Sequence, residues 1–222
     1  MTFPPFSHVP IPATCAGRPT TPDGLVIPFG NVQLADGGCD FRTHHNARWL
    51  ACWEQRRCQV CGNRLTVPAV LLCGPRQLAR LLFDEPPLHP ECARYTSRAC
   101  PMVAGQRSHY RTGPVLAHRS RGGTCPDPGC DCGGWVPTPG ITADPGGGSA
   151  HEWFAVYVRS YSLADTPDGR MTGGICSPAD VVRVRRVSRP GRPPGPWEPV
   201  PNWLDSYTPP ELAHPTREDP AR

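Results

Sequence analysis

Two pairs of residues with metal-binding side chains stand out in this sequence. Cys58 and Cys61 form a Cys-x-x-Cys pair that is followed by Gly62, and His89 and Cys92 form a His-x-x-Cys pair. Thiolate sulfur and imidazole nitrogen are ligands that zinc prefers, and structural zinc ions take four of them in a tetrahedron. The residue types and their spacing therefore predict one zinc site made by these four side chains.

The two pairs need different local structures to bring their ligands to one ion. A tight turn can direct both sulfurs of a Cys-x-x-Cys pair at the same ion, and Gly62 permits the left-handed backbone that such a turn often needs. Pro90 is typical of the first position of a helix, so we expect His89 at the N-cap and Cys92 in the first turn. Helical residues three apart share a face, and a thiolate at a helix N-terminus is stabilised by the helix dipole.

The stretch from Cys58 to Pro101 resembles the treble-clef zinc-finger superfamily, in which a turn and a following helix supply two ligands each. More narrowly, CQVCG, PPLHPECARY and ACP are similar to sequences of small zinc-binding proteins of unknown function from actinobacteria and their phages or mobile elements. The resemblance implies a structural zinc ion. It does not imply one activity, because treble clefs serve nucleases, nucleic-acid binders and protein-interaction modules alike.

Other assignments of these cysteines stay open on the sequence alone. Cys100 could replace His89 as the fourth ligand, and the four residues could instead be ordinary core residues, because reduced cysteine behaves as a small buried hydrophobe. The segment of residues 62–88 between the pairs is longer than in compact fingers. We expect the neighbouring Cys52 and Cys73 to be core thiols.

A second group of three cysteines lies in the sequence CPDPGCDCGGW, at Cys125, Cys130 and Cys132. Three thiolates so close in sequence repel one another unless they are protonated, oxidised or neutralised by a metal ion. One interpretation is a second zinc site with His118, His151 or Cys176 as the fourth ligand. The other is a reduced or disulfide-containing loop, and the spacing does not decide between them.

The composition points to a thin core. Of 222 residues, 31 are proline and 23 are glycine, so we expect roughly 150 ordered residues joined by long irregular connections. Small cores usually need a staple such as a metal ion. All 23 basic residues are arginine and the net charge is +4, which permits nucleic-acid binding without indicating a strongly basic domain.

The sequence shows no feature of export or membrane insertion. The N-terminus lacks a basic region followed by a long apolar run, and the longest apolar stretch, residues 69–73, is too short to cross a bilayer. We therefore expect a soluble, cytoplasmic protein without membrane contact, in which the twelve cysteines are reduced or metal-bound rather than paired.

The predicted fold class is α+β. The expected organisation is a Pro-rich N-terminal segment (1–38), a helix plus treble-clef zinc domain (39–104), a Cys-, Gly- and Pro-rich loop region (105–150), a strand-rich segment packed on the zinc domain (151–188) and a disordered Pro-rich tail (189–222).

Hydrophobic periodicity predicts the elements within these parts. One helix begins at Asn46 as N-cap, has Trp49, Leu50 and Trp53 on one face and ends near Arg56 and Arg57. Two more helices begin at Pro75 and at Pro90, the second ending before Pro101. The predicted strands are residues 25–29, 65–73, 152–163 and 181–187.

His44 and His45 are the most tempting catalytic residues. A histidine pair beside a zinc finger suggests a divergent His-metal (HNH-like) nuclease, but no histidine lies between Cys61 and His89, where that family carries its catalytic residues. The pair can equally precede the helix at Asn46 without any catalytic role. We therefore expect a protein that is not an enzyme, with the nuclease as the alternative.

Four arginines on the predicted strands are candidates for nucleic-acid contact: Arg159, Arg183, Arg185 and Arg186. Arginine interleaved with aromatic residues can hold phosphate and stack on bases, although a charged sheet face is often merely solvated. Trp197, Trp203 and Tyr207 in the tail could dock on a protein partner or fold back. The leading hypothesis is a zinc-binding adaptor of a phage or mobile element that contacts DNA, RNA or protein; a further alternative is an assembly protein without nucleic-acid affinity.

Overall fold

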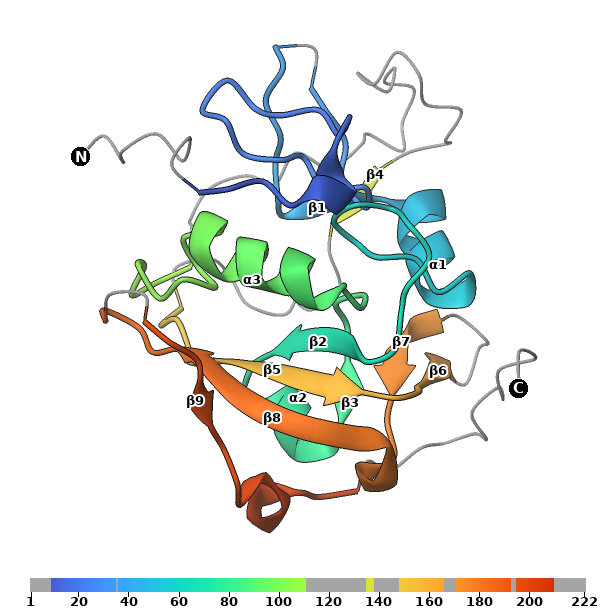
Figure 1. Ribbon diagram of the computed structural model, residues 1–222, viewed down its shortest axis with the longest axis vertical. Coiled ribbons are helices and arrows are strands. Elements are labelled where there is room, and N and C mark those ends of the chain that lie inside the picture. The colour runs from blue at the N-terminus through green and yellow to red at the C-terminus, as the bar shows by residue number, and fades with distance from the viewer. Residues whose placement is uncertain are drawn as a thin grey trace.

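The computed structural model of the chain (Figure 1) describes residues 9–34, 36–110, 135–137, 148–165, 171–192 and 195–209. These residues form short helices and antiparallel sheets, so the predicted mixture of helix and strand is confirmed. The helices are α1 (Asn46–Glu54), α2 (Pro75–Arg80) and α3 (Pro90–Ala99), with 3-10 turns η2 (Ala13–Cys15), η4 (Pro178–Asp180) and η5 (Trp203–Ser206).

The largest sheet has the strand order β2-β5-β8-β9, with every neighbouring pair antiparallel. Its strands are β2 (Ala69–Cys73), β5 (Trp153–Val158), β8 (Val181–Ser188) and β9 (Glu198–Pro199). A three-stranded sheet has the order β3-β7-β6, and a two-stranded sheet joins β1 to β4. Their strands are β1 (Thr43–His45), β3 (Leu82–Phe83), β4 (Trp135–Pro137), β6 (Ser162–Asp165) and β7 (Met171–Ile175).

Strands β2 and β5 of the largest sheet are buried on both faces. Along β5, Phe154, Val156 and Val158 belong to one apolar cluster, and Ala155 and Tyr157 belong to another. Side chains of a strand alternate between faces, so the two clusters lie on opposite sides of the sheet. The near-continuous apolar sequence of β5, without a polar face, follows from this double burial.

The face of the sheet that carries Ala155 and Tyr157, here called the first face, is covered by α3. The N-terminal loops lie on the far side of that helix (Figure 1). Ala93 and Ala99 of α3 pack in the same cluster as Val70 of β2. The Tyr95 hydroxyl of α3 accepts a hydrogen bond of 2.9 Å from the backbone N–H of Val26. Helix α3 therefore joins the N-terminal segment to the sheet.

The second face packs against α1, α2 and the small sheet. Its cluster includes Trp49 and Trp53 of α1, Leu78 of α2 and Phe83 of β3. The Tyr161 hydroxyl donates to the carbonyl oxygen of Trp53 at 3.1 Å, and the two rings meet edge to face at 5.5 Å. The predicted apolar face of the first helix is thus confirmed.

The helix boundaries differ from the prediction by a few residues. The N-cap of α1 is His45 rather than Asn46, because the His45 Nδ1 accepts the backbone N–H of Arg48 at 3.4 Å. The helix ends at Glu54, before Arg56 turns left-handed with φ 53°. The two predicted last-turn arginines therefore lie beyond it.

Three of the four predicted strands are correct for position, and two of these are partly wrong for length. The predicted strand 65–73 is only β2, and the predicted strand 152–163 is divided into β5 and β6. The strand predicted at 181–187 is confirmed as β8, which pairs antiparallel with β5. The hairpin of β6 and β7 was not predicted, because its Gly-rich second strand lacks an apolar alternation.

The N-terminal segment does not form the strand predicted at 25–29. Val26 makes only an isolated bridge with Thr20, while the backbone N–H groups of Phe29 and Gly30 bond to the Cys-x-x-Cys turn. These hydrogen bonds to a distant part of the chain take the place of the strand-to-strand hydrogen bonds that a sheet would supply. The apolar side chains of Val26 and Ile27 are nevertheless buried.

The predicted disorder of the tail does not hold for residues 195–209. Strand β9 pairs with β8, and its Pro199 is compatible with an edge strand because no ladder hydrogen bond from its nitrogen is needed there. Trp197 and Trp203 pack against the two clusters. The described part of the tail therefore folds back onto the domain.

None of the helices in the described ranges has the length and apolar character needed to cross a bilayer. The longest of them, α3, has ten residues.

Gly173→Ala should destabilise the protein by roughly 1–3 kcal/mol, because a Cβ on β7 would overlap the Phe83 carbonyl oxygen of β3. Gly195→Ala is the matched control, since its Cβ would meet no atom within 4 Å. Urea denaturation measures both free energies of unfolding. Equal stability of the two variants would contradict the close packing of β3 on β7.

Candidate metal centre and arginine pocket

The Cys58-x-x-Cys61 pair forms a closed turn. The backbone N–H of Gly62 donates to the Cys58 carbonyl, and the backbone N–H of Cys58 donates to the Asn63 carbonyl, both at 2.8 Å. Gly62 has φ 79°, and a Cβ there would lie 2.8 Å from the Phe29 ring. The predicted left-handed backbone at Gly62 is confirmed. The packed Phe29 ring is a second reason for glycine at this position, because it leaves no room for a Cβ atom.

The His89-x-x-Cys92 pair lies at the start of α3, as predicted. His89 is the N-cap with extended backbone angles (φ −66°, ψ 152°), Pro90 is the first helical residue and Cys92 follows in the first turn. The backbone N–H of His89 lies 3.5 Å from Cys58 Sγ. The helix N-terminus is thereby in direct contact with the turn.

The four side chains converge on one buried point. The ligand atoms of Cys58, Cys61, His89 and Cys92 all lie within 4.8 Å of one another, and all four residues are buried. His89 Nδ1 faces the sulfurs and lies 3.4 Å from Cys61 Sγ. Within the described ranges this is the one group of three or more such side chains with metal-binding geometry.

The protonation of the cluster favours a bound cation. Hydrogen bonds with Cys58 and Cys92 lower the pKa of Cys61, whereas burial raises the pKa of Cys58 to about 12. Three buried thiols cannot all ionise beside one another without a positive charge, and a divalent ion supplies it. The side chains present therefore fit a metal ion, and a donor set of three sulfurs and one imidazole is typical of structural zinc.

Further groups support the metal ligands. His89 Nε2 lies 3.0 Å from the Arg64 carbonyl oxygen, which assigns the ring proton to Nε2 and leaves Nδ1 free to coordinate. Thr14 Oγ1 and Cys15 Sγ lie 3.5 Å and 3.9 Å from Cys92 Sγ and can donate to its thiolate. Thr14 and Cys15 could not be predicted from the sequence, because neither belongs to a spaced pair.

Cys52, Cys73 and Cys100 do not belong to the metal-binding group. Cys100 is the C-cap of α3, about 12 Å along the helix from Cys92 by the rise per residue, so it does not replace His89. Cys52 and Cys73 are buried core thiols, as predicted, and burial raises their pKa values.

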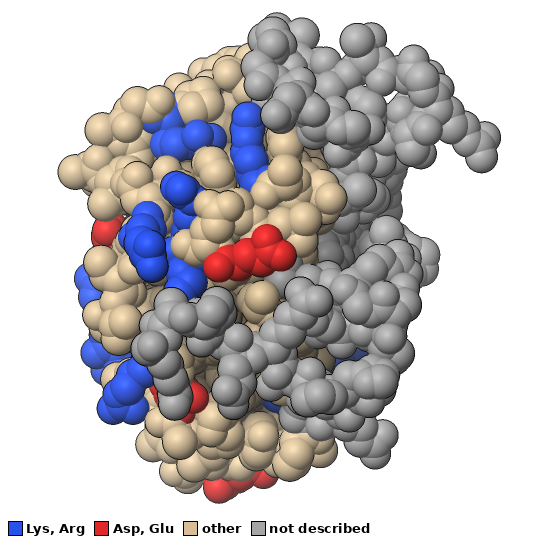
Figure 2. All heavy atoms as spheres, turned by 90° about the vertical axis from the view of Figure 1, so that its right-hand side faces the viewer, with Lys and Arg blue, Asp and Glu red and all other residues tan. Residues whose placement is uncertain are grey.

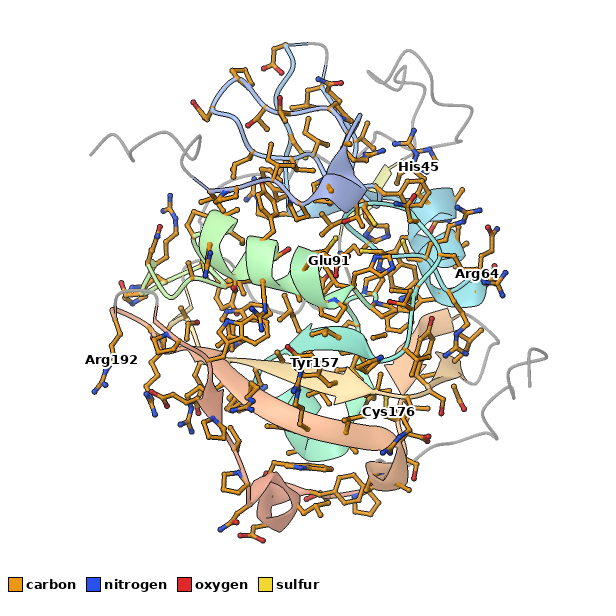
Figure 3. The ribbon with its side chains drawn as sticks, viewed as in Figure 1. His45, Arg64, Glu91, Tyr157, Cys176 and Arg192 are labelled. Carbon is orange, nitrogen blue, oxygen red and sulfur yellow. The ribbon has the colours of Figure 1, made fainter. Side chains whose placement is uncertain are left out.

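The second cysteine group, Cys125, Cys130 and Cys132 with His118, lies outside the described residues. Two alternative fourth ligands are described and have other contacts. His151 bonds through Nε2 to the Tyr110 hydroxyl at 2.7 Å and through Nδ1 to the Glu152 carbonyl at 2.9 Å. Cys176 is buried in the cluster on the second face of the sheet (Figure 3). The second metal site stays a prediction.

The two adjacent histidines serve the fold. His45 caps α1 (Figure 3), and His44 is buried with its ring stacked on Trp49 at 5.2 Å. Burial, and secondarily the neighbouring His45, lower the pKa of His44 to about 4, so its ring is neutral at pH 7. Neither belongs to the metal-binding group.

The four candidate arginines separate into two kinds. Arg186 lies over the Phe154 ring and pairs with Glu152 at 2.7 Å and Glu198 at 3.3 Å. Arg159 follows the end of β5 and donates to the Ala179 carbonyl at 3.3 Å. Arg183 and Arg185, in contrast, line a common pocket with arginines of α3 that the sequence analysis did not select.

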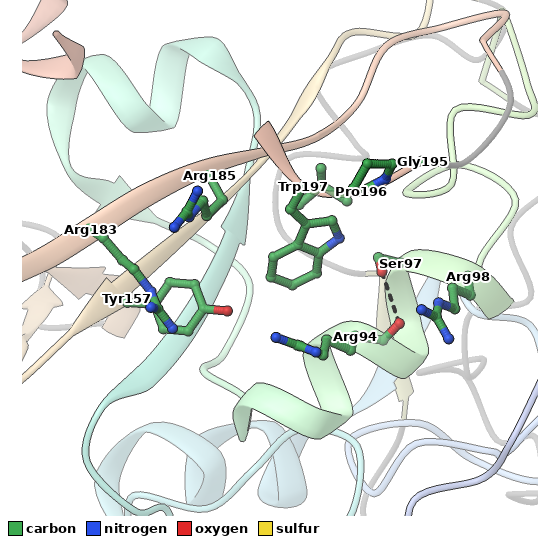
Figure 4. Close-up of a pocket in the computed structure, with 10 residues that line it drawn as sticks. Arg94, Ser97, Arg98, Tyr157, Arg183, Arg185, Gly195, Pro196 and Trp197 are labelled. Carbon is green, nitrogen blue, oxygen red and sulfur yellow. Dashed lines mark hydrogen bonds between the residues drawn. The ribbon is translucent and has the colours of Figure 1, made fainter. Parts of the chain in front are cut away.

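This arginine pocket lies between α3, β8 and the segment that leads into β9, and has a volume of about 650 Å³ (Figure 4). Its lining residues are Arg94, Ser97, Arg98, Tyr157, Arg183, Arg185, Val187, Gly195, Pro196 and Trp197. No acidic side chain is among them. The helical spacing of Arg94 and Arg98 was the available signal, since residues four apart share a helix face.

Arginine is not confined to the pocket. Figure 2 shows basic side chains gathered on the side of the molecule that carries α1. The pocket differs from such a surface because it combines arginine with a recess and two aromatic rings, Tyr157 and Trp197.

No family model, curated protein or solved structure matches the chain. Functional inference therefore rests on the chain's own residues.

The purified protein should carry one metal ion at the four-residue site, and we expect zinc. Cys58→Ser and Cys92→Ser each leave three ligands and should lose the ion, whereas Cys15→Ser should keep it, because Cys15 contacts a ligand without completing the set. Inductively coupled plasma mass spectrometry gives the metal identity and stoichiometry. Full metal content in Cys92→Ser would contradict the assignment.

Proposed function

We propose that the protein is a zinc-binding adaptor that contacts nucleic acid through the arginine pocket, with the zinc ion in a structural role. The observation that carries the proposal is the pocket itself. Four guanidinium groups from two separate elements line one recess with two aromatic rings and without a carboxylate. Arginine beside aromatic rings is a recurrent means of holding phosphate and bases.

The charges of the pocket are available to a ligand. Across the described residues, none of the four lining arginines has an ion-pair partner, in contrast to Arg186 and Arg189, which pair with Glu198. Arg94, Arg98 and Arg183 are exposed to solvent. A phosphate group would meet positive charge there without displacing an internal carboxylate.

A structural role for the metal follows from its ligands. Four protein side chains complete a tetrahedral set and leave no position for a substrate, whereas catalytic zinc sites keep one position open. The ion would fix the first turn of α3, and Arg94 follows Cys92 by two residues in that helix. The metal therefore acts on the pocket by holding α3 in place.

The resemblance of the Cys58–Pro101 stretch to treble-clef proteins of actinobacteria and their phages suggests the biological setting and the finer classification. The alternative of an HNH-like nuclease has less support, because His44 is stacked in the core and His45 caps a helix. The alternative of a protein partner at the tail is weakened by the packing of Trp197 and Trp203 on the domain. An assembly protein would show oligomers and no nucleic-acid affinity.

Fluorescence anisotropy with labelled single-stranded and duplex oligonucleotides at about 50 mM salt, where phosphate contacts are strong, tests the proposal. The Arg94→Ala/Arg185→Ala variant should bind more weakly, and its slope of log affinity against log salt should fall by about 0.7 per arginine for a single strand. Arg76→Ala/Arg80→Ala on exposed positions of α2 removes the same charge elsewhere and should change affinity less. Absence of binding by the wild type at this salt would refute nucleic-acid contact.

A further inference from the structure

We infer that the arginine pocket takes an unpaired base of a single strand, stacked against Trp197, with the flanking phosphates on the arginines at its rim. This inference rests on the proposed function and specifies its ligand. An arginine on a sheet surface can bind any polyanion, so the preference for a base comes from the recess and its aromatic rings.

The aromatic wall of the pocket is already oriented. The Trp197 and Tyr157 rings meet edge to face, with centroids 6.4 Å apart and planes at 65°. The Arg183 guanidinium covers the Tyr157 face at 4.0 Å from the ring centroid. Trp197, which is half-buried, is therefore the ring that remains for stacking, and base stacking on an aromatic ring does not depend on base identity.

Polar groups surround this ring from separate elements. Figure 4 shows Arg183 and Arg185 extending from β8, Arg94 and Arg98 extending from α3, and the Tyr157 hydroxyl pointing into the pocket. The Ser97 hydroxyl is already engaged with the Arg94 carbonyl at 2.8 Å. The free donors are thus mostly guanidinium groups, which bind phosphate in a planar, two-pronged manner and also stack on bases.

A second hollow continues the pocket across α3. It has a volume of about 210 Å³ and shares Arg94 and Arg98 with the arginine pocket. Its other lining residues are the largely apolar Val9, Pro10, Ile11, Pro12 and Tyr95, together with one carboxylate, Glu91. The two arginines of α3 lie between the hollows, where a backbone phosphate would separate two successive bases. The arrangement fits a strand better than a single nucleotide.

The recess disfavours a duplex. Bases in a double helix are stacked and paired, and each must be unstacked before it can enter a pocket. A duplex could reach the exposed arginines of the rim, but its paired bases could not stack on Trp197. Single-stranded DNA and RNA share the chemistry required here, since no contact described depends on the sugar.

Anisotropy measurements on single strands of about ten nucleotides, on a hairpin duplex and on a mononucleotide test the inference. The wild type should bind the single strand more tightly than either other probe. Trp197→Leu should reduce single-strand affinity roughly tenfold, the effect of losing one stacked base, and should leave duplex affinity unchanged. Trp197→Phe keeps an aromatic ring and should retain most of the affinity.

Thermal denaturation of each variant identifies any loss that comes from unfolding, because Trp197 also packs on the domain. Equal affinity for strand and duplex, with no effect of Trp197→Leu in folded protein, would overturn the inference and leave nucleic-acid contact standing. Mononucleotide binding as tight as strand binding would contradict the inference that a strand runs across α3 from one hollow into the other. Failure of every probe to bind would refute the inference and the proposed function together.

Discussion

Three thiols and one imidazole that meet at a buried point are the constraint on which the rest of the molecule depends. Their charges can be accommodated only by protonation or by a cation, and a metal ion satisfies all four at once. The turn at Cys58, the start of α3 and the N-terminal residues around Cys15 all contact this point. Because Pro-rich segments form few ladders, such a centre replaces the regular structure that the N-terminal part of the chain lacks.

The sheet beneath α3 is the second organising element, and it needs a cover on each face. Strands β2 and β5 are apolar on both sides, so an uncovered face would expose residues such as Val156 or Tyr157. A metal ion bound by the four side chains would hold α3 over one face, whereas α1 and its two tryptophans cover the other face without any metal ligand. Loss of such an ion would loosen α3 and the N-terminal segment before it affected the packing around Trp53.

The sequence was informative where a local rule determines structure. Spaced ligands, the glycine after Cys61 and the proline after His89 each act within a few residues, so the turn, the helix start and the ligand set could be derived from them. Thr14 and Cys15 could not, because they reach Cys92 only through the tertiary fold. The hairpin of β6 and β7 escaped for a related reason: Gly174 is selected by contact with the Trp53 ring, not by strand propensity.

The arginine pocket shows the same division between local and tertiary information. Arg183 and Arg185 could be chosen because they lie on a predicted strand, but the same choice included Arg186, which faces the other way and is neutralised by two glutamates. Arg94 and Arg98 are separated from β8 by more than eighty residues, and only the packing of α3 over the sheet brings them to the same recess. An ion held by the four side chains would fix the first turn of that helix, so metal binding would couple to the shape of the pocket even though none of the four ligands lines the pocket. Binding of a strand across α3 would in turn stabilise the helix in its metal-bound position, because a ligand that prefers one arrangement of the helix shifts the population toward it.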